Sequence, residues 1–170
     1  GRKLRYSSGS PKPFYAPDPG NFPSSIPTVL AISLPRAPNN VFDGAVLDTG
    51  AAKSVIGLSQ AHAYCREYRI PFAPTTSTSR FIFGDQECAS LGKLNILVPC
   101  PGTDLKVCVD IVQPSVPLLL GIDTLDKHKL NVLSVENKIH SVVFGWTLPL
   151  VRQQGHLYLK WHPPSETFYS

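Results

Sequence analysis

One short segment constrains this chain more than any other: Val46 to Ile56, in which an acidic residue stands in a tight turn between two apolar runs. The turn is Asp48-Thr49-Gly50, and this tripeptide occurs once. A carboxylate at the end of an apolar strand is partly desolvated, and it becomes chemically useful when a second carboxylate shares a proton with it. A chain with one such carboxylate obtains the second from another copy of itself across a twofold axis. The segment therefore predicts a homodimer.

The size and composition of the chain suit one folded domain with extensions. Its 170 residues are 42% hydrophobic, which is enough for one good core. The 16 Lys and Arg residues against 12 Asp and Glu give a net charge of +4, spread along the chain, so nucleic acid is not an expected partner. The basic residues 1–5 are better explained as a solvated tail. No apolar run of about 18 residues and no secretion signal is present, so we expect no membrane partner.

The cysteines give no pattern typical of a metal site or a disulfide framework. Cys65, Cys88, Cys100 and Cys108 are scattered without a Cys-x-x-Cys pair, so free thiols are expected. His62 and Cys65 have a spacing at which one helix points both at a metal, but no second pair of ligands follows. We therefore predict no metal and no cofactor.

Composition divides the chain into three parts. Residues 1–25 are rich in Pro, Ser and Gly and predict a flexible linker. Residues 26–145 carry the apolar segments of a folded domain, and residues 146–170 are assigned to a C-terminal extension. No internal repeat is apparent, because Asp-Thr-Gly is not echoed in the second half of the chain.

Apolar alternation and turn residues predict a mainly β domain. Residues 26–34 and 41–47 are expected to form a hairpin. Residues 58–68 have helical spacing and predict a short surface helix, with Ser59 as a possible N-cap and Pro71 as a stop. The further elements expected are a Gly-tipped hairpin over 80–87 followed by 91–98, strands over 105–112 and 116–120, a short helix over 121–128, a hairpin of 130–135 with 138–144, and a late edge strand over 156–161.

The order of these features resembles the retropepsin family of retroviruses and LTR retrotransposons. The resemblance covers about residues 26–135 and depends on Asp48-Thr49-Gly50-Ala51 after an aliphatic strand, on Ser54-Val55-Ile56 behind it, and on Leu118-Leu119-Leu120-Gly121 before a helix. It implies a retropepsin-like acid protease fold with a closed β-barrel-like half, a flap hairpin and one or two short helices, functional as a homodimer. Residues 155–161 also resemble a segment that follows the protease in some Copia-like polyproteins, although a plain amphipathic strand explains them equally well.

The resemblance implies roles for the residues of the turn. In a retropepsin-like dimer, Asp48 of each subunit holds one water between two carboxylates, one acting as general base and the other as general acid. Ionising both of two neighbouring carboxylates costs free energy because like charges repel, so the pair retains one proton. Thr49 hydrogen-bonds across the dimer beneath the pair, Gly50 lets the backbone approach the substrate, and Ala51 leaves room for it. Ala51 is equally well explained as a small core residue.

The hairpin tip is the candidate flap, a mobile cover over an extended peptide. It comprises Phe83, Gly84, Asp85 and Gln86. Retroviral flaps are often glycine-rich, whereas this tip is polar, so a plain surface hairpin is the alternative.

The resemblance also implies a lining for the substrate subsites. An apolar lining favours an apolar residue on either side of the scissile bond. The residues concerned are equally good core candidates. They are Val55, Ile56, Val116, Pro117 and Leu118.

Two departures from the family pattern occur together. Many retropepsins have an Asp after the Ala and an Arg after the Gly before the helix, where this chain has Ala52 and Ile122. Loss of both partners avoids a lone buried charge but removes a polar clamp near the dimer interface. We therefore expect a dimer that is weaker or that depends more on apolar contacts.

The function favoured is an aspartic endopeptidase that matures a retrotransposon or retroviral-type polyprotein by cutting between apolar residues. Its expected partners are a second copy of the chain and the polypeptide substrate, in the cytoplasm or within virus-like particles. Two alternatives share the fold: a catalytically inactive module for dimerisation or peptide binding, and a host-domesticated protein with a cellular substrate. The intact Asp48-Thr49-Gly50 favours the enzyme.

Overall fold

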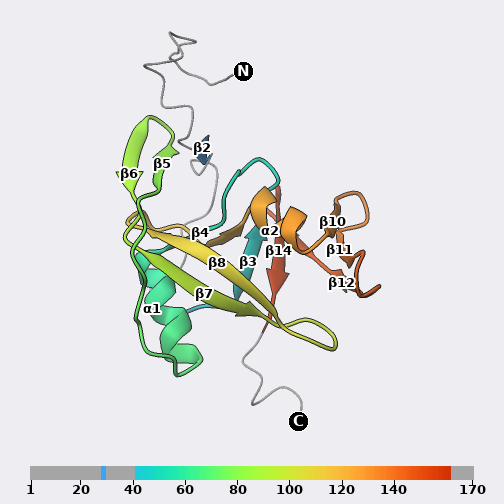
Figure 1. Ribbon diagram of the computed structural model, residues 1–170. Coiled ribbons are helices and arrows are strands. Elements are labelled where there is room, and N and C mark those ends of the chain that lie inside the picture. Colours follow the sequence, from blue (N-terminus) through green and yellow to red (C-terminus); the bar gives the residue numbers. More distant parts are fainter. Residues whose placement is uncertain (1–27, 30–40, 162–170) are drawn as a thin grey trace.

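The computed structural model describes residues 28–29 and 41–161, and its elements are mainly strands (Figure 1). This part of the chain has two helices, α1 (Leu58–Glu67) and α2 (Ile122–Lys127). Neither of these helices has the length and apolar character needed to span a membrane. The strands are β2 (Thr28–Val29), β3 (Gly44–Leu47), β4 (Val55–Gly57), β5 (Arg80–Phe83), β6 (Gln86–Ala89), β7 (Lys93–Val98), β8 (Leu105–Val112), β9 (Leu118–Leu120), β10 (Leu130–Leu133), β11 (Lys138–Ser141), β12 (Thr147–Pro149), β13 (Val151–Gln153) and β14 (His156–Lys160).

The largest sheet has seven strands in the order β13-β14-β3-β9-β4-β8-β7. β3 runs parallel to β9 and β4 parallel to β8, whereas the other neighbours are antiparallel. Side chains of β7 alternate between more and less buried positions, as expected for a strand with one face on a core. β3 and β9 are buried along their whole length because they lie in the middle of the sheet.

A hairpin of β5 and β6 projects from the body of the molecule (Figure 1). Its two-residue turn is Gly84-Asp85, and Gly84 has a φ of +63°, which suits the first central position of a type II′ turn. β2 pairs in parallel with β5 and completes the small sheet β2-β5-β6. Another three-stranded sheet, β10-β11-β12, lies beside α2.

Helix α1 packs against the large sheet and confirms the helix expected over 58–68. Its buried residues include Ala61, Tyr64 and Cys65, and the Leu97 N–H donates a 2.9 Å hydrogen bond to the Tyr64 hydroxyl oxygen. The N-cap is Gly57, not Ser59, because the chain enters the helix directly from β4. A Cβ at Gly57 would lie 2.6 Å from the Val116 carbonyl oxygen, so this close approach requires glycine.

The first predicted hairpin is wrong in the part that the structure describes. β2 pairs with β5 in the small sheet, and β3 lies between β14 and β9 in the large one. Residues 1–27 and 30–40, which include the predicted linker and the turn of that hairpin, lie outside the described residues. The alternation of apolar and polar residues predicted the strand around 44–47 but not its neighbouring strands, because strand pairing depends on residues far away in the sequence.

The Gly-tipped hairpin is confirmed, but its second strand is β6 and not 91–98. β7 instead pairs antiparallel with β8 along its whole length. The strand over 105–112, the strand ending at Leu120, the helix near 121–128 and the hairpin of β10 with β11 are also confirmed. Asn137 has a φ of +55° in the turn of that last hairpin, a conformation that asparagine tolerates better than most residues.

The strand expected at the end of the chain is β14, but it is not an edge strand. It pairs with β13 on one side and β3 on the other, so β13 forms the edge. Just beyond it, the buried Trp161 ring lies edge-on to Phe42 with 5.4 Å between ring centroids. The described residues after 145 therefore share sheets with the residues before it, and the boundary placed there stays a prediction.

The closed β-barrel-like half is not formed by the described strands. The seven-stranded sheet is open, with β13 at one edge and β7 at the other. The fold class shown by the structure is mainly β with two short helices in the described residues.

The docking of β14 predicts a large effect of a buried side chain there. Leu159 is 5% exposed, so Leu159→Ala removes packing and leaves a cavity that should lower the free energy of unfolding by roughly 2–5 kcal/mol. Urea denaturation measures the effect. Val135→Ala is the control, because Val135 is 91% exposed and its truncation should change stability by about 0.5 kcal/mol or less. Equal midpoints for the two variants would contradict this docking.

Candidate functional site

The Asp48 turn begins where two parallel strands end together. Leu47 of β3 is in register with Leu120 of β9, and the Asp48 N–H donates a 3.0 Å hydrogen bond to the Leu120 carbonyl. The Gly50 N–H donates to Asp48 Oδ1 at 3.0 Å, which fixes the orientation of the carboxylate. Asp48 is half-buried, whereas Thr49 and Gly50 are exposed. The turn therefore presents a carboxylate and a hydroxyl at the surface from a rigid sheet.

A polar network, in which Ser54 and Thr124 are buried and Asp123 is exposed, attaches this turn to α2. Ser54 is 1% exposed, and its hydroxyl donates to Asp123 Oδ1 at 2.8 Å. The Ser54 N–H donates to Asp123 Oδ2 at 3.1 Å, and the Gly121 N–H donates to Ser54 Oγ at 2.9 Å. Thr124 Oγ1 lies 2.6 Å from the same oxygen. One serine thus connects the segment after the turn with the start of the helix.

Backbone contacts bring the turn and α2 even closer. The Ile122 N–H donates to the Ala51 carbonyl at 2.8 Å. A Cβ at Gly121 would lie 2.7 Å from that carbonyl oxygen and 2.8 Å from the Lys53 carbonyl oxygen. Only glycine fits between these two oxygens, so Gly121 permits the contact. Gly50 is different, because a Cβ there would meet only Asp48 Oδ1, at 3.4 Å.

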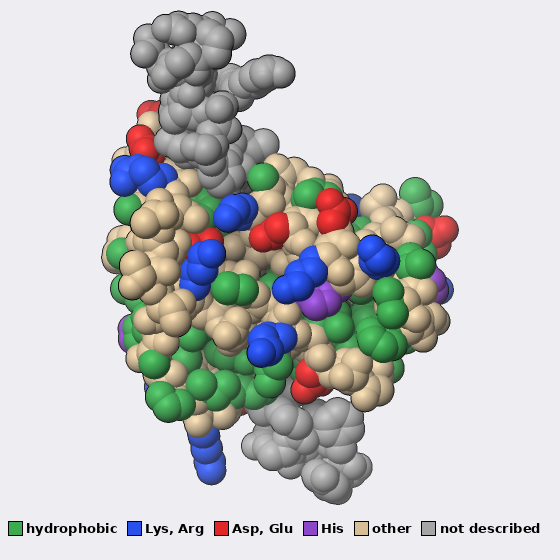
Figure 2. Space-filling view, viewed as in Figure 1, with side chains coloured by type: hydrophobic (Ala, Val, Ile, Leu, Met, Phe, Trp, Pro, Cys, Tyr) green, Lys and Arg blue, Asp and Glu red, His purple; other side chains and the backbone are tan. Residues whose placement is uncertain are grey.

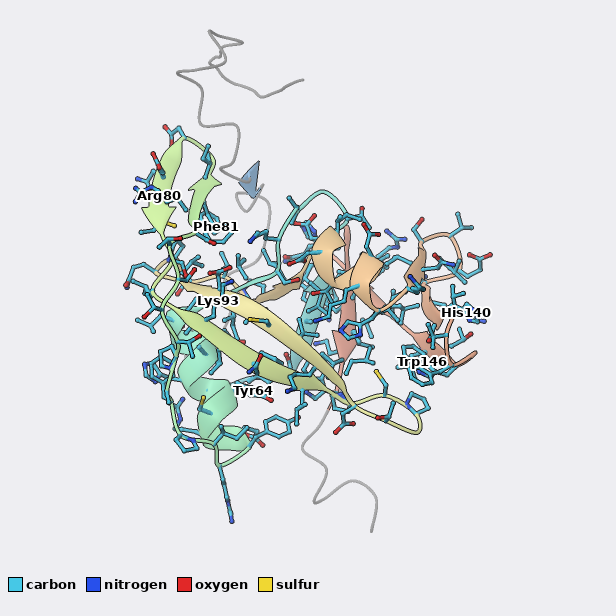
Figure 3. The ribbon with its side chains drawn as sticks, viewed as in Figure 1. Tyr64, Arg80, Phe81, Lys93, His140 and Trp146 are labelled. Carbon is cyan, nitrogen blue, oxygen red and sulfur yellow. The ribbon has the colours of Figure 1, made fainter. Side chains whose placement is uncertain are left out.

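The candidate flap stands over a second apolar cluster, separate from the main core. Phe81 is fully buried at the base of the hairpin (Figure 3), and Phe83 and Cys88 pack on the same cluster. Arg80 and Glu87 form an exposed ion pair across the two hairpin strands. Gly84, Asp85 and Gln86 form the exposed tip. The buried members of the cluster are Val46, Val55, Phe81, Val112, Val116 and Leu119.

The structure brings only some of the expected substrate-lining residues together. Val55 and Val116 share the second cluster with Phe83, whereas Ile56 and Leu118 belong to the main core. Pro117 and Ala51 are also buried, and Ala51 is 1% exposed beneath α2. These side chains are therefore core residues in the single chain, and their contact with a substrate stays a prediction.

A shallow cleft of about 340 Å³ lies beside Thr49. Besides Leu47 and Thr49, its lining comes from β10 and the loop after it, and from β13, β14 and the turn between them. Arg152 lines it and donates to the Ser134 carbonyl at 2.7 Å and to Asn137 Oδ1 at 3.1 Å. Sequence reasoning missed this neighbourhood because β14 was not expected next to β3.

Charged groups are not concentrated on the visible face. Figure 2 shows Lys and Arg side chains scattered among uncharged ones, so the net charge of +4 forms no single block there. The ion pairs of the described residues, Lys160 with Asp43 at 3.3 Å and Arg80 with Glu87, are both on the surface. Exposed pairs of this kind contribute little to stability.

The described residues hold no cluster of three or more His, Cys, Asp or Glu arranged for a metal ion. The four cysteines are free thiols. Burial raises the pKa of the Cys65 and Cys88 thiols and, with the nearby Asp104 charge, raises that of Cys100 to about 11. Little thiolate is therefore present at these three positions near neutral pH, which makes them poor nucleophiles.

Ser54 and Asp123 are the site residues that sequence reasoning did not single out for a role. Their types carry a weak signal, because Ser54 directly precedes the apolar Val55 and Ile56 and Asp123 stands in the first turn of a short helix. The two predicted departures, Ala52 and Ile122, are both exposed. The loop and the helix are instead connected by Ser54, two residues after Ala52, and by Asp123, one residue after Ile122.

Comparisons with known proteins show a likeness to solved structures and to no family model or curated protein. Among solved structures, the retroviral protease-like domain of Ddi1 from Leishmania major is similar, with 19% identity over 68% of this chain and 91% of that chain. The TM-score is 0.46, and at this level the likeness carries no conclusion about function.

The Ser54 network predicts a cost for removing its hydroxyl. Ser54→Ala leaves the buried Gly121 N–H without its acceptor and removes the hydroxyl donor to Asp123, which keeps the backbone N–H groups of Ser54 and Thr124 as donors. The loss should lower the free energy of unfolding by about 1–3 kcal/mol. Urea denaturation tests this. The matched control is Ser59→Ala, because the buried Ser59 hydroxyl has no hydrogen-bond partner in the described part of the chain. A loss no larger than that of the control would show that the network contributes nothing.

Proposed function

We propose that this protein is an aspartic endopeptidase in which Asp48 supplies one of two catalytic carboxylates. The observation that carries the proposal is the turn itself: a half-buried carboxylate, oriented by the Gly50 N–H, at the end of a buried strand and beside an exposed hydroxyl. Backbone bonds to β9 and α2 hold this turn, so the carboxylate does not need to reorganise before reaction.

The second carboxylate comes from a second copy of the chain. Asp-Thr-Gly occurs once in the sequence, and the turn that carries it is exposed at Thr49 and Gly50. Gly50 has neither a crowded Cβ position nor a positive φ, so the fold of one chain gives no reason for glycine there. Close approach of a partner or a substrate backbone gives such a reason. A twofold dimer places two identical turns face to face.

The chemistry follows from two carboxylates sharing one proton. The ionised one takes a proton from a bound water as that water attacks the peptide carbonyl carbon, and the protonated one donates its proton to the carbonyl oxygen. Collapse of the tetrahedral species returns a proton to the leaving nitrogen and breaks the C–N bond. No covalent intermediate forms. Such a pair works while it holds one proton, so the rate should fall at high pH, where both carboxylates ionise.

The substrate is an extended polypeptide with apolar residues around the cleaved bond. The β5–β6 hairpin covers it, and the second apolar cluster beneath the hairpin receives its apolar side chains once the hairpin moves. A viral-type or retrotransposon polyprotein, processed in the cytoplasm or in virus-like particles, is the substrate that the sequence resemblance favours.

A second candidate function is a dimerisation or peptide-binding module without activity. The observation that favours it is that Val55, Val116 and Leu118 are buried in the single chain, so these three residues line no open subsite there. A host-domesticated protein with a cellular substrate, in place of a retrotransposon or retroviral protein, would use the same site.

The principal prediction concerns Asp48. Asp48→Asn should abolish cleavage of a peptide library at mildly acidic pH, because the amide neither shares a proton nor activates water, while the unfolding midpoint stays close to that of the wild type. The matched control is Asp126→Asn, since Asp126 is exposed on α2 and its carboxylate has no role in the site. Cleavage by the Asp48→Asn variant would remove the mechanism, and folded wild-type protein that never cleaves would favour the inactive module.

Dimer formation is tested at Thr49. Thr49→Val removes the exposed hydroxyl and keeps the shape of the side chain, so it should raise the dimer dissociation constant by about tenfold, which corresponds to one lost hydrogen bond. Sedimentation velocity at several protein concentrations measures it. Thr103→Val is the control, because Thr103 is exposed in the loop between β7 and β8. Equal dissociation constants would contradict the role given to Thr49.

A further inference from the structure

An acidic residue lies in the interior outside the Asp48 turn. Asp110 is 4% exposed in β8, within a run of buried strand residues. A carboxylate at such a position costs free energy unless its oxygens are hydrogen-bonded. Asp110 has no ion-pair partner among the described side chains, whose two salt bridges lie elsewhere.

Two hydroxyls satisfy this carboxylate, and both belong to the roots of the β5–β6 hairpin. The Ser77 hydroxyl donates to Asp110 Oδ1 at 2.6 Å, and the Ser90 hydroxyl donates to the same oxygen at 2.8 Å. Ser77 precedes β5 and Ser90 follows β6. One carboxylate oxygen therefore holds the two ends of the hairpin.

Each hydroxyl oxygen also accepts a hydrogen bond from a backbone N–H group near the hairpin. The Ser79 N–H donates to Ser77 Oγ at 3.2 Å, and the Gly92 N–H donates to Ser90 Oγ at 3.1 Å. A 2.8 Å bond from the Ser90 N–H to the Ser79 carbonyl closes the base of the hairpin. The chain direction at both roots thus depends on where the carboxylate lies.

The backbone of Asp110, unlike its side chain, is bonded to the segment that follows the Asp48 turn. Its N–H donates to the Ser54 carbonyl at 3.2 Å, and Asp110 is in register with Val55 of β4. Ser54 is the residue that attaches the turn to α2. The side chain of Asp110 therefore reaches the hairpin while its backbone is bonded to the segment behind the turn.

We propose that Asp110 is a positioning residue that sets the place and mobility of the β5–β6 hairpin relative to the Asp48 turn. The proposal rests on the proposed function in one respect only, the covering of a peptide by this hairpin. Packing of Phe81 and Phe83 on the second apolar cluster holds the face of the hairpin, whereas the carboxylate and the two serines hold its roots. The hairpin then pivots on a fixed base.

Amide hydrogen exchange followed by mass spectrometry tests the proposal without using activity. The double variant Ser77→Ala with Ser90→Ala should speed exchange in residues 80–89 by roughly 10- to 100-fold, the effect of losing hydrogen bonds to a charged group. Asp110→Asn should give a smaller increase, because the amide keeps one acceptor oxygen. The single substitution Ser77→Thr retains a hydroxyl and should leave exchange in the hairpin as slow as in the wild type. Ser59→Ala is the matched control.

The outcomes separate local positioning from general stability. Faster exchange confined to the hairpin supports the proposal. Unchanged exchange in the double variant overturns it, and so does an equal increase in α1, which would show that the network serves only overall stability.

Peptide kinetics then test the link to the proposed function. Looser hairpin roots should raise KM with a smaller change in kcat, whereas a smaller folded fraction lowers apparent kcat and leaves KM unchanged. Faster hairpin exchange with unchanged KM would overturn a role in covering the peptide. Absence of cleavage by the wild type would remove the proposed function, while the exchange data would still decide whether Asp110 positions the hairpin.

Discussion

Strands β3 and β9 run parallel and in register, and much of the candidate site depends on this pairing. Parallel strands that end together place the segments that follow them at one edge of the sheet. Here those segments are the Asp48 turn and the start of α2, and they are joined by the bond from the Asp48 N–H to the Leu120 carbonyl. A shift of one residue in this register would turn the buried strand side chains to the other face and separate the turn from Gly121.

Buried polar side chains are few among the residues that the structure describes, and two of them lie where elements are joined. Ser54 connects the Asp48 turn with α2, and Asp110 connects the hairpin roots with the segment behind the turn. Apolar contacts stabilise without fixing direction, whereas hydrogen bonds of buried groups specify geometry and are costly to leave unpaired. The buried serine and aspartate therefore define relative positions that a purely apolar core would leave free.

Much of this architecture is encoded locally and was predictable from the sequence. The spacing of Ala61, Tyr64 and Cys65 predicted α1, and Gly84 predicted the tight hairpin turn. Pairings across long separations were not predictable, because alternation shows that a strand exists but not which strand is its neighbour. The same limit applies to the site: the turn at Asp48 was evident, whereas the partners Asp123 and Asp110 depend on contacts 69 and 33 residues away along the chain.

The position of β14 has a consequence for the order of events during synthesis. β3 is paired on one side by residues 157–160, and the Lys160–Asp43 contact spans 117 positions. A ribosome releases the strand that carries Asp48 long before it releases this partner, and the closure of so long a loop is slow. Until then β3 exposes an unpaired edge next to the Asp48 turn. A nascent chain therefore completes this sheet late, so the turn that we propose to be catalytic is framed only after residues 157–160 have emerged.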